Sequence, residues 1–228
     1  MEKVRQASHA GSWYTDNPAK LSSDLGEWIR ATGLTKSPHV RGVIAPHAGY
    51  SYSGRAAAYA FANIDPTNIT RIFILGPSHH YYTPKCALST AKVYKTPIGD
   101  LPVDVEMIKE MRAMGKFGMM DLRVDEAEHS MEMHLPFLSK VFQGHDVKVV
   151  PILVGAVSAE NEAMYGELLS KYVDDPNNFF SVSSDFCHWG SSSSKIKINF
   201  LKYEQSSQCQ TMRDSSVSYA SAAAKSEC

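Results

Sequence analysis

The sequence predicts an α/β protein with a parallel-rich sheet. Short unbroken apolar runs, such as the one at 72–75, end abruptly at turn residues, here Gly76 and Pro77. Such runs are typical of strands buried on both faces of a parallel sheet. An alanine-rich stretch at 56–62 separates this strand from an earlier one at 40–45. The three segments together therefore predict a β-α-β unit.

Helix-capping residues and the spacing of apolar residues predict the other helices and strands along the chain. Asn17, followed by proline, starts a helix that Gly33 ends, and Asp104 caps a second helix that stops near Gly115. Ser158 caps a third helix, whose apolar residues recur at helical spacing. Further strands are predicted at 86–88, 93–94, 147–154 and 179–184.

The chain of 228 residues is long enough for one large domain or two small ones. We predict a single domain, with an α/β core and a histidine-lined pocket at 1–190. We expect residues 191–228 to form a short linker and strand of the same domain. The serine run at 191–194 marks this change, and the alternating residues 195–198 are typical of an edge strand.

Composition excludes several classes of function. The net charge is −1, from 23 basic and 24 acidic side chains, and no basic block is present. We therefore expect neither nucleic-acid binding nor membrane insertion. The first residues lack the apolar stretch of a signal peptide, and the four cysteines show no close pair or metal-type spacing. We expect reduced thiols in a cytosolic or nuclear protein.

Three of the predicted strands end in a loop that carries histidine. His47, His79 and His188 each follow an apolar run directly. Because the carboxyl ends of parallel strands meet at one edge of a sheet, where α/β proteins bind ligands, we expect these three side chains to line one cavity.

His47 and His79 are the leading candidates for metal ligands. A neutral imidazole on a rigid loop is a good ligand for iron, copper or zinc, but a metal site requires at least a third ligand. The alternative is that the two rings only hydrogen-bond the backbone of their own loops.

His188 is a candidate acid or base. Asp185 stands three residues before it and can orient or charge the imidazole. The alternative is an Asx turn at Asp185 with a buried His188.

The acidic segment 125–138 carries two more histidines and looks helical. His129 and His134 are five residues apart, whereas the zinc helix H-E-x-x-H needs a spacing of four. We expect His134 to pack against the sheet and His129 to lie in a second shell around the pocket. The loop at 76–78 lacks the glycines of a phosphate-binding loop, so no nucleotide cofactor is expected.

Seven longer strings resemble one known family. They are ASHAGSWY (7–14), IAPHAGYSYSG (44–54), RIFILGPSHH (71–80), EHSMEMHLPF (128–137), VPILVGA (150–156), SSDFCHWG (183–190) and YEQSSQC…DSSVSYA (203–220). They resemble the Memo family, whose name abbreviates "mediator of cell motility" downstream of a receptor tyrosine kinase.

The resemblance implies a fold and a metal site. The fold would be that of the class III extradiol dioxygenases, an αβ sandwich around a mostly parallel mixed sheet. His47 and His79 would match two metal ligands, holding iron or copper. His188 would match the acid–base histidine of the dioxygenases, with Asp185 beside it.

The resemblance also implies a partner. Trp13 and Tyr52 match aromatic positions that hold a phosphotyrosine peptide of a receptor tyrosine kinase or an adaptor. His80, His188 and Asp185 would complete that pocket. The function implied is a non-catalytic scaffold in cell motility and cytoskeletal signalling.

One departure from the family pattern concerns the third metal ligand. In the family, a long helical segment after SSDFCHWG carries a cysteine ligand, and here residues 191–199 bridge that gap. The chain therefore looks like an internally shortened member with two metal ligands and weak metal binding. The alternatives are an extradiol dioxygenase-type enzyme with non-heme iron, or a shortened isoform that has lost activity.

Overall fold

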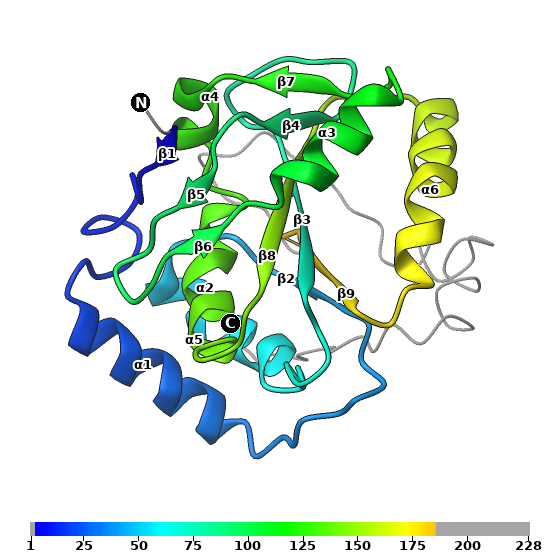
Figure 1. Ribbon diagram of the computed structural model, residues 1–228. Coiled ribbons are helices and arrows are strands. Elements are labelled where there is room, and N and C mark those ends of the chain that lie inside the picture. The colour runs from blue at the N-terminus through cyan, green and yellow to red at the C-terminus, as the bar shows by residue number, and fades with distance from the viewer. Residues whose placement is uncertain (1–2, 186–228) are drawn as a thin grey trace, which may run out of the picture.

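The computed structural model describes residues 3–185, which form two sheets with helices packed around them (Figure 1). The larger sheet has six strands in the order β2-β9-β3-β8-β4-β7, and the smaller has three in the order β1-β5-β6. The strands of the larger sheet are β2 (Gly42–Ala45), β3 (Arg71–Pro77), β4 (Ala87–Ser89), β7 (Gly118–Met120), β8 (Lys148–Val154) and β9 (Asn178–Ser183). Those of the smaller sheet are β1 (Val4–Arg5), β5 (Val93–Tyr94) and β6 (Leu101–Pro102).

The larger sheet is mixed and mostly parallel, as predicted. Strands β2, β9, β3 and β8 run parallel to one another, whereas β4 is antiparallel to β8. Ala45 at the end of β2 pairs with Ser183 of β9, and Leu75 near the end of β3 pairs with Val182. The carboxyl ends of these three strands therefore lie together at one edge of the sheet.

Helices cover both faces of this sheet. They are α1 (Pro18–Ala31), α2 (Tyr50–Phe61), α3 (Val105–Ala113), α4 (Leu122–Ala127), a 3₁₀ turn (Glu132–His134), α5 (Leu135–Val141) and α6 (Ala159–Val173). On one face α1, α2 and α5 pack together, with the rings of Phe61 and Phe137 stacked at 4.7 Å. On the other face, Tyr172 of α6 packs on Phe73 of β3, and α3 lies beside α6. This is an αβ sandwich.

Some predicted boundaries were wrong for physical reasons. Helix α2 begins at Tyr50, six residues before the alanine run that predicted it. The segment 125–138 is not one helix, because the chain leaves α4 at Glu128 in an extended conformation and turns before α5. Strands β1, β6 and β7 were not predicted, since arginine, proline or glycine interrupts the apolar residues in each of them. The predicted caps Asn17, Asp104 and Ser158 are confirmed by their hydrogen bonds.

Several expectations fall on residues outside 3–185. These are His188, the serine run at 191–194, the edge strand at 195–198 and the domain boundary at 190. Within 3–185, no helix has the length and apolar character needed to cross a bilayer. Cys86 is a buried free thiol, and burial raises its pKa to about 11.

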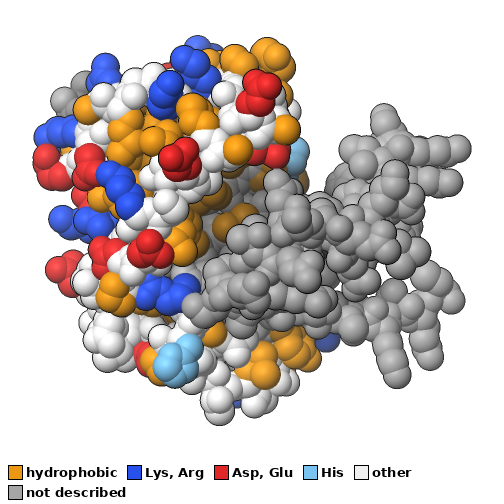
Figure 2. Space-filling view, turned by 90° about the vertical axis from the view of Figure 1, so that its right-hand side faces the viewer, with side chains coloured by type: hydrophobic (Ala, Val, Ile, Leu, Met, Phe, Trp, Pro, Cys, Tyr) orange, Lys and Arg blue, Asp and Glu red, His pale blue; other side chains and the backbone are white. Residues whose placement is uncertain are grey.

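The visible surface agrees with the balanced charge of the sequence. On the side of the molecule that carries α6, basic and acidic side chains are intermingled over the described residues (Figure 2).

Candidate metal centre

The two strand-end histidines meet, as the sequence predicted. His47 follows β2 and His79 follows β3, and β9 lies between these strands. Their ring centroids are 5.1 Å apart in an edge-to-face arrangement. His47 is buried, and about a third of the His79 side chain is exposed. One ring therefore lies below the surface while the other borders the solvent.

A third histidine joins this pair. His129 lies between α4 and the 3₁₀ turn, and its ring centroid is 4.2 Å from that of His79 and 5.5 Å from that of His47. One nitrogen from each of the three rings lies within 4.8 Å of the other two. From the sequence, His129 was expected only in a second shell, because its spacing from His134 fits no helical zinc motif. The extended residue Glu128 turns the chain so that His129 faces the strand ends.

Hydrogen bonds fix two of the three rings. Nδ1 of His79 donates to Oε1 of Glu128 at 2.8 Å, and Nδ1 of His47 is 2.6 Å from Oγ of Ser183. A partner at Nδ1 sets the tautomer of an imidazole and favours metal binding through Nε2. The rings of His47 and His79 therefore do not serve only to hydrogen-bond loop backbone, which was the alternative.

Charge at the site is set by Glu128. Burial opposes its ionisation, but hydrogen bonds from the ring and backbone of His79 and from the backbone of Ser130 lower its pKa to about 2. The hydrogen bond between the ring of His79 and the carboxylate of Glu128 also raises the pKa of His79. Burial, with the neighbouring rings of His79 and His47, lowers the pKa of His129 to about 4. His129 is therefore neutral at pH 7, as a metal ligand must be.

Asp185 lies beside His47. Its Oδ1 accepts the backbone N–H of His47 at 2.9 Å, and its Oδ2 is 3.6 Å from Nε2 of that ring. Asp185 was expected to orient His188, a residue outside the described part of the chain. Within 3–185, this carboxylate braces the loop of His47.

The predicted peptide residues divide into two groups. The Trp13 ring lies 4.4 Å from the His129 ring and is 36% exposed, and the His80 ring lies 6.2 Å from the same histidine. Tyr52 lies in the first turn of α2 and is 87% exposed, with no ring contact to the histidines among the described residues. The structure thus brings Trp13 and His80 to the site and leaves Tyr52 on the surface.

His9 also lies near the site, although nothing in the sequence indicated a role for it. Its ring centroid is 6.0 Å from that of His129, and Glu132 accepts hydrogen bonds from both its Nδ1 and its backbone N–H. A histidine in an irregular N-terminal segment gives no spacing signal that connects it with residue 129. His134, by contrast, is buried against the sheet as expected, bonded to Ser181 and to the carbonyl of Ala45.

Three imidazole nitrogens fit a transition metal. A zinc-type ion about 2.1 Å from each nitrogen would hold them about 3.4 Å apart in a tetrahedral site. Spacings of up to 4.8 Å would have to shorten by as much as about 1.4 Å to reach that distance. Neutral imidazole suits iron, copper and zinc, so the donor chemistry fits the metals that the sequence suggested.

Comparison with known proteins places these features in one family. A family model described as "Memo-like protein" matches residues 5–195. Protein MEMO1 of Xenopus tropicalis is 47% identical over 204 residues, which cover 89% of this chain and 67% of that protein. Protein MEMO1 of Homo sapiens is 50% identical over 188 residues, covering 82% and 63%. The memo-1 homolog of Caenorhabditis elegans is 44% identical over 206 residues, covering 90% and 57%.

The chain thus spans between 57% and 67% of the length of these relatives. The matched region contains all three histidines of the candidate metal centre and the strands that position them. The family match over most of the chain shows that this protein belongs to the Memo-like protein family.

Proposed function

We propose that the chain binds one transition-metal ion through His47, His79 and His129. The observation that supports this most strongly is the approach of three imidazole nitrogens to within 4.8 Å at the carboxyl edge of the sheet. Two of these rings have their Nδ1 atoms hydrogen-bonded, which prepares them to bind through Nε2.

We favour iron or copper as the metal, because the sequence motifs resemble those of the Memo family, for which these two metals are implied. The weak binding expected earlier rested on a site with two protein ligands. With His129 as a third ligand, that expectation loses its basis, because each ligand bond contributes to both geometry and affinity.

Elemental analysis of the purified protein tests the metal site. We expect about one equivalent of iron or copper in the wild type after loading and removal of excess metal. His129→Ala should lose most of it, as should His47→Ala. His39→Ala is the matched control, because His39 is exposed and lies before β2, at the opposite end of that strand from His47. Metal content that is equal in all four proteins would reject the site.

We further propose a non-catalytic signalling role for the protein, as a scaffold in cell motility and cytoskeletal regulation, located in the cytosol or nucleus. Its partner would be a phosphotyrosine peptide of a receptor tyrosine kinase or adaptor, bound at the rim of the site. Support comes from family membership and from the exposed aromatic side chains of Trp13 and Tyr52.

Peptide binding can be measured by fluorescence anisotropy with matched phosphorylated and unphosphorylated peptides. We expect Trp13→Ala and Tyr52→Ala to weaken binding of the phosphorylated peptide. Tyr59→Ala is the control, because this exposed tyrosine lies on the same helix as Tyr52. Equal affinity for both peptides would count against the signalling role.

A second candidate function is ring-opening oxidation by non-heme iron. The observation in its favour is Asp185, whose carboxylate lies 3.6 Å from Nε2 of His47. Iron oxygenases commonly bind the metal through two histidines and one carboxylate. Oxygen uptake by the iron-loaded protein with a catechol, lost in Asp185→Asn, would support this function over the scaffold.

A further inference from the structure

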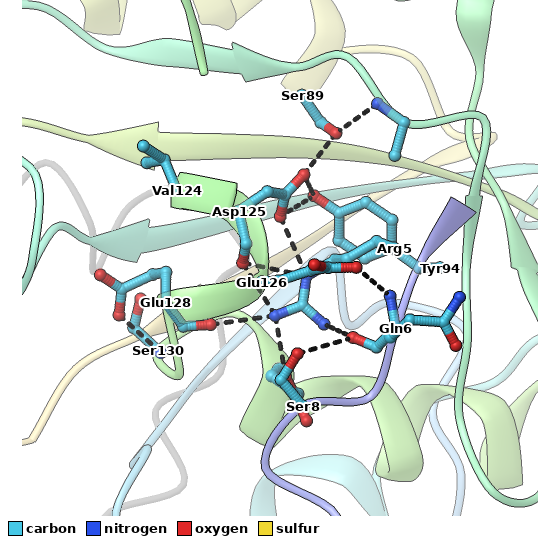
Figure 3. Close-up of polar contacts among 12 residues, drawn as sticks. Arg5, Gln6, Ser8, Ser89, Tyr94, Val124, Asp125, Glu126, Glu128 and Ser130 are labelled. Carbon is cyan, nitrogen blue, oxygen red and sulfur yellow. Dashed lines mark hydrogen bonds and ion pairs between the residues drawn. The ribbon is translucent and has the colours of Figure 1, made fainter. Parts of the chain in front are cut away.

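A buried ionic network lies next to the three histidines, and its centre is Arg5 of β1 (Figure 3). The side chains of Arg5, Asp125 and Glu132 are all fully buried. Nε of Arg5 is 2.9 Å from Oδ1 of Asp125, and its Nη2 is 2.8 Å from Oε2 of Glu132. Burial opposes the charge of Arg5, but these two carboxylates raise its pKa, so the guanidinium is charged.

Arg5 also binds the backbone on the N-terminal side of His129. Its Nε and Nη2 donate to the carbonyl of Asp125 at 3.1 and 2.9 Å, and Nη2 donates to the carbonyl of Glu128 at 3.0 Å. Because it also binds Glu132, this one guanidinium contacts residues that precede His129 in the chain and a residue that follows it. A single planar group with five N–H donors therefore sets the path of the loop at 125–132.

The other side of this loop is tied to the end of β3. The Glu128 carboxylate accepts hydrogen bonds from the backbone N–H and the ring of His79, at 2.7 and 2.8 Å. Oγ of Ser130 donates to the carbonyl of Pro77 at 2.8 Å. His129 is thus carried by a loop that Arg5 fixes on one side and the strand end fixes on the other.

Glu132 extends the network to the N-terminal segment that packs on His129. It accepts hydrogen bonds from the backbone N–H of His9 at 2.8 Å and from the hydroxyl of Tyr14 at 2.9 Å. These bonds hold both ends of the segment that carries Trp13, whose ring packs on His129. The same buried charges therefore support the backbone of His129 and the aromatic side chain that contacts its ring.

We propose that Arg5 is a positioning residue of the metal centre, which holds His129 in place as the third ligand and Glu128 in place as the partner of His79. This inference rests on the proposed metal site. Lysine cannot replace Arg5 in this role, because an ammonium has three donors and no planar fork to bridge the four acceptor atoms of this loop. A role in stability alone would leave the histidine geometry unchanged once the variant is folded.

Copper(II) bound to the protein, with coordinated imidazoles counted by pulsed electron paramagnetic resonance, tests the inference. We expect three imidazoles in the wild type and two in Arg5→Lys, with metal affinity lower by about 10- to 100-fold. Arg71→Lys is the matched control. Arg71 also forms a partly buried ion pair, with Asp104 at 2.7 Å, but it lies at the amino end of β3, away from the histidines.

A metal-free measurement separates this inference from the proposed function. The ring resonances of His129, His134 and His39 are compared by NMR in apo wild type and Arg5→Lys. We expect only the His129 resonance to move. Absence of metal binding by the wild type would reject the metal site, whereas an unmoved His129 resonance or three retained imidazoles would reject the role of Arg5.

If Arg5→Lys does not fold, Glu132→Gln provides the test. It keeps the shape of the side chain but removes one of the two charges that face Arg5. The same displacement of the His129 resonance is expected, and an unchanged resonance would overturn the inference.

Discussion

The two strand-end histidines differ in the group that holds Nδ1, and this difference has chemical consequences. His79 donates to the carboxylate of Glu128, whereas His47 is bonded to the hydroxyl of Ser183. A carboxylate partner makes an imidazole a more basic ligand than a hydroxyl does. His79 should therefore contribute more to metal affinity than its greater exposure suggests, and Glu128 should control that contribution.

Glu128→Gln tests this control. The amide can still accept the hydrogen bond from His79, but it lacks the negative charge. We expect metal affinity to fall by about 10- to 100-fold, measured by competition with a chelator of known affinity. Glu126→Gln is the control, because Glu126 lies in the same segment and accepts one backbone hydrogen bond, from Gln6. Equal affinities in the two variants would contradict the prediction.

A second prediction at this scale concerns His134 and pH. Burial lowers its pKa in the folded protein to about 4, below the ordinary value of 6.5. The unfolded chain therefore takes up a proton first as the pH falls, and stability is lost between pH 6.5 and 4. For this residue the loss between pH 7 and pH 5 should be about 2 kcal/mol.

Urea unfolding of the wild type and His134→Gln at the two pH values measures this loss. Glutamine keeps polar contacts to Ser181 and Ala45 available but does not titrate. Other titrating groups are common to both proteins, so the difference between their pH dependences isolates His134. A variant that loses as much stability as the wild type would show that His134 does not titrate as stated.

At the scale of elements, two glycines within helices have opposite surroundings. Gly54 lies where α2 crosses α1, and a Cβ built there would be 2.4 Å from Cζ3 of Trp28. Gly166 lies in α6, and a Cβ there meets nothing within 4 Å. The absence of a side chain at Gly54 thus allows α1 and α2 to approach closely. At Gly166 no neighbouring element is close enough for a side chain to matter for packing.

The same substitution should therefore have opposite effects. Gly166→Ala should stabilise the protein by about 0.5–1 kcal/mol, because alanine favours a helix over glycine. Gly54→Ala gains the same propensity but displaces the rigid Trp28 ring, so we expect a net destabilisation of about 1–3 kcal/mol. Thermal and urea unfolding measure both. A stabilising effect at Gly54 would mean that α1 can move away without loss.

At the scale of the whole molecule, the sequence predicted the sheet better than it predicted the site. Strands β3 and β8 were predictable because their apolar runs are bounded by turn residues, and His47 and His79 followed from the strand ends. The roles of His129 and Arg5 depend on where the loop at 125–132 lies relative to β1 and β3. That placement arises from contacts between residues that are 123 and 53 positions apart in the chain, which no local pattern records.

The metal centre joins distant parts of the chain, so metal binding should stabilise the whole fold. A ligand that binds only the folded state adds about 4.1 kcal/mol at a free concentration 1,000 times its Kd. For a chain of this size, each kcal/mol raises Tm by about 2–4 °C, so we expect an increase of about 8–16 °C. Differential scanning fluorimetry with iron(II) under anaerobic conditions, or with copper, measures it.

The controls for this last prediction are a chelator and two variants. Excess chelator should return Tm to the apo value. His129→Ala should show a much smaller increase, because its loop no longer joins the strand ends through the metal. His39→Ala should behave as the wild type. If His129→Ala is stabilised as much as the wild type, the ion binds elsewhere or through His47 and His79 alone, and the loop at 125–132 has no part in holding it.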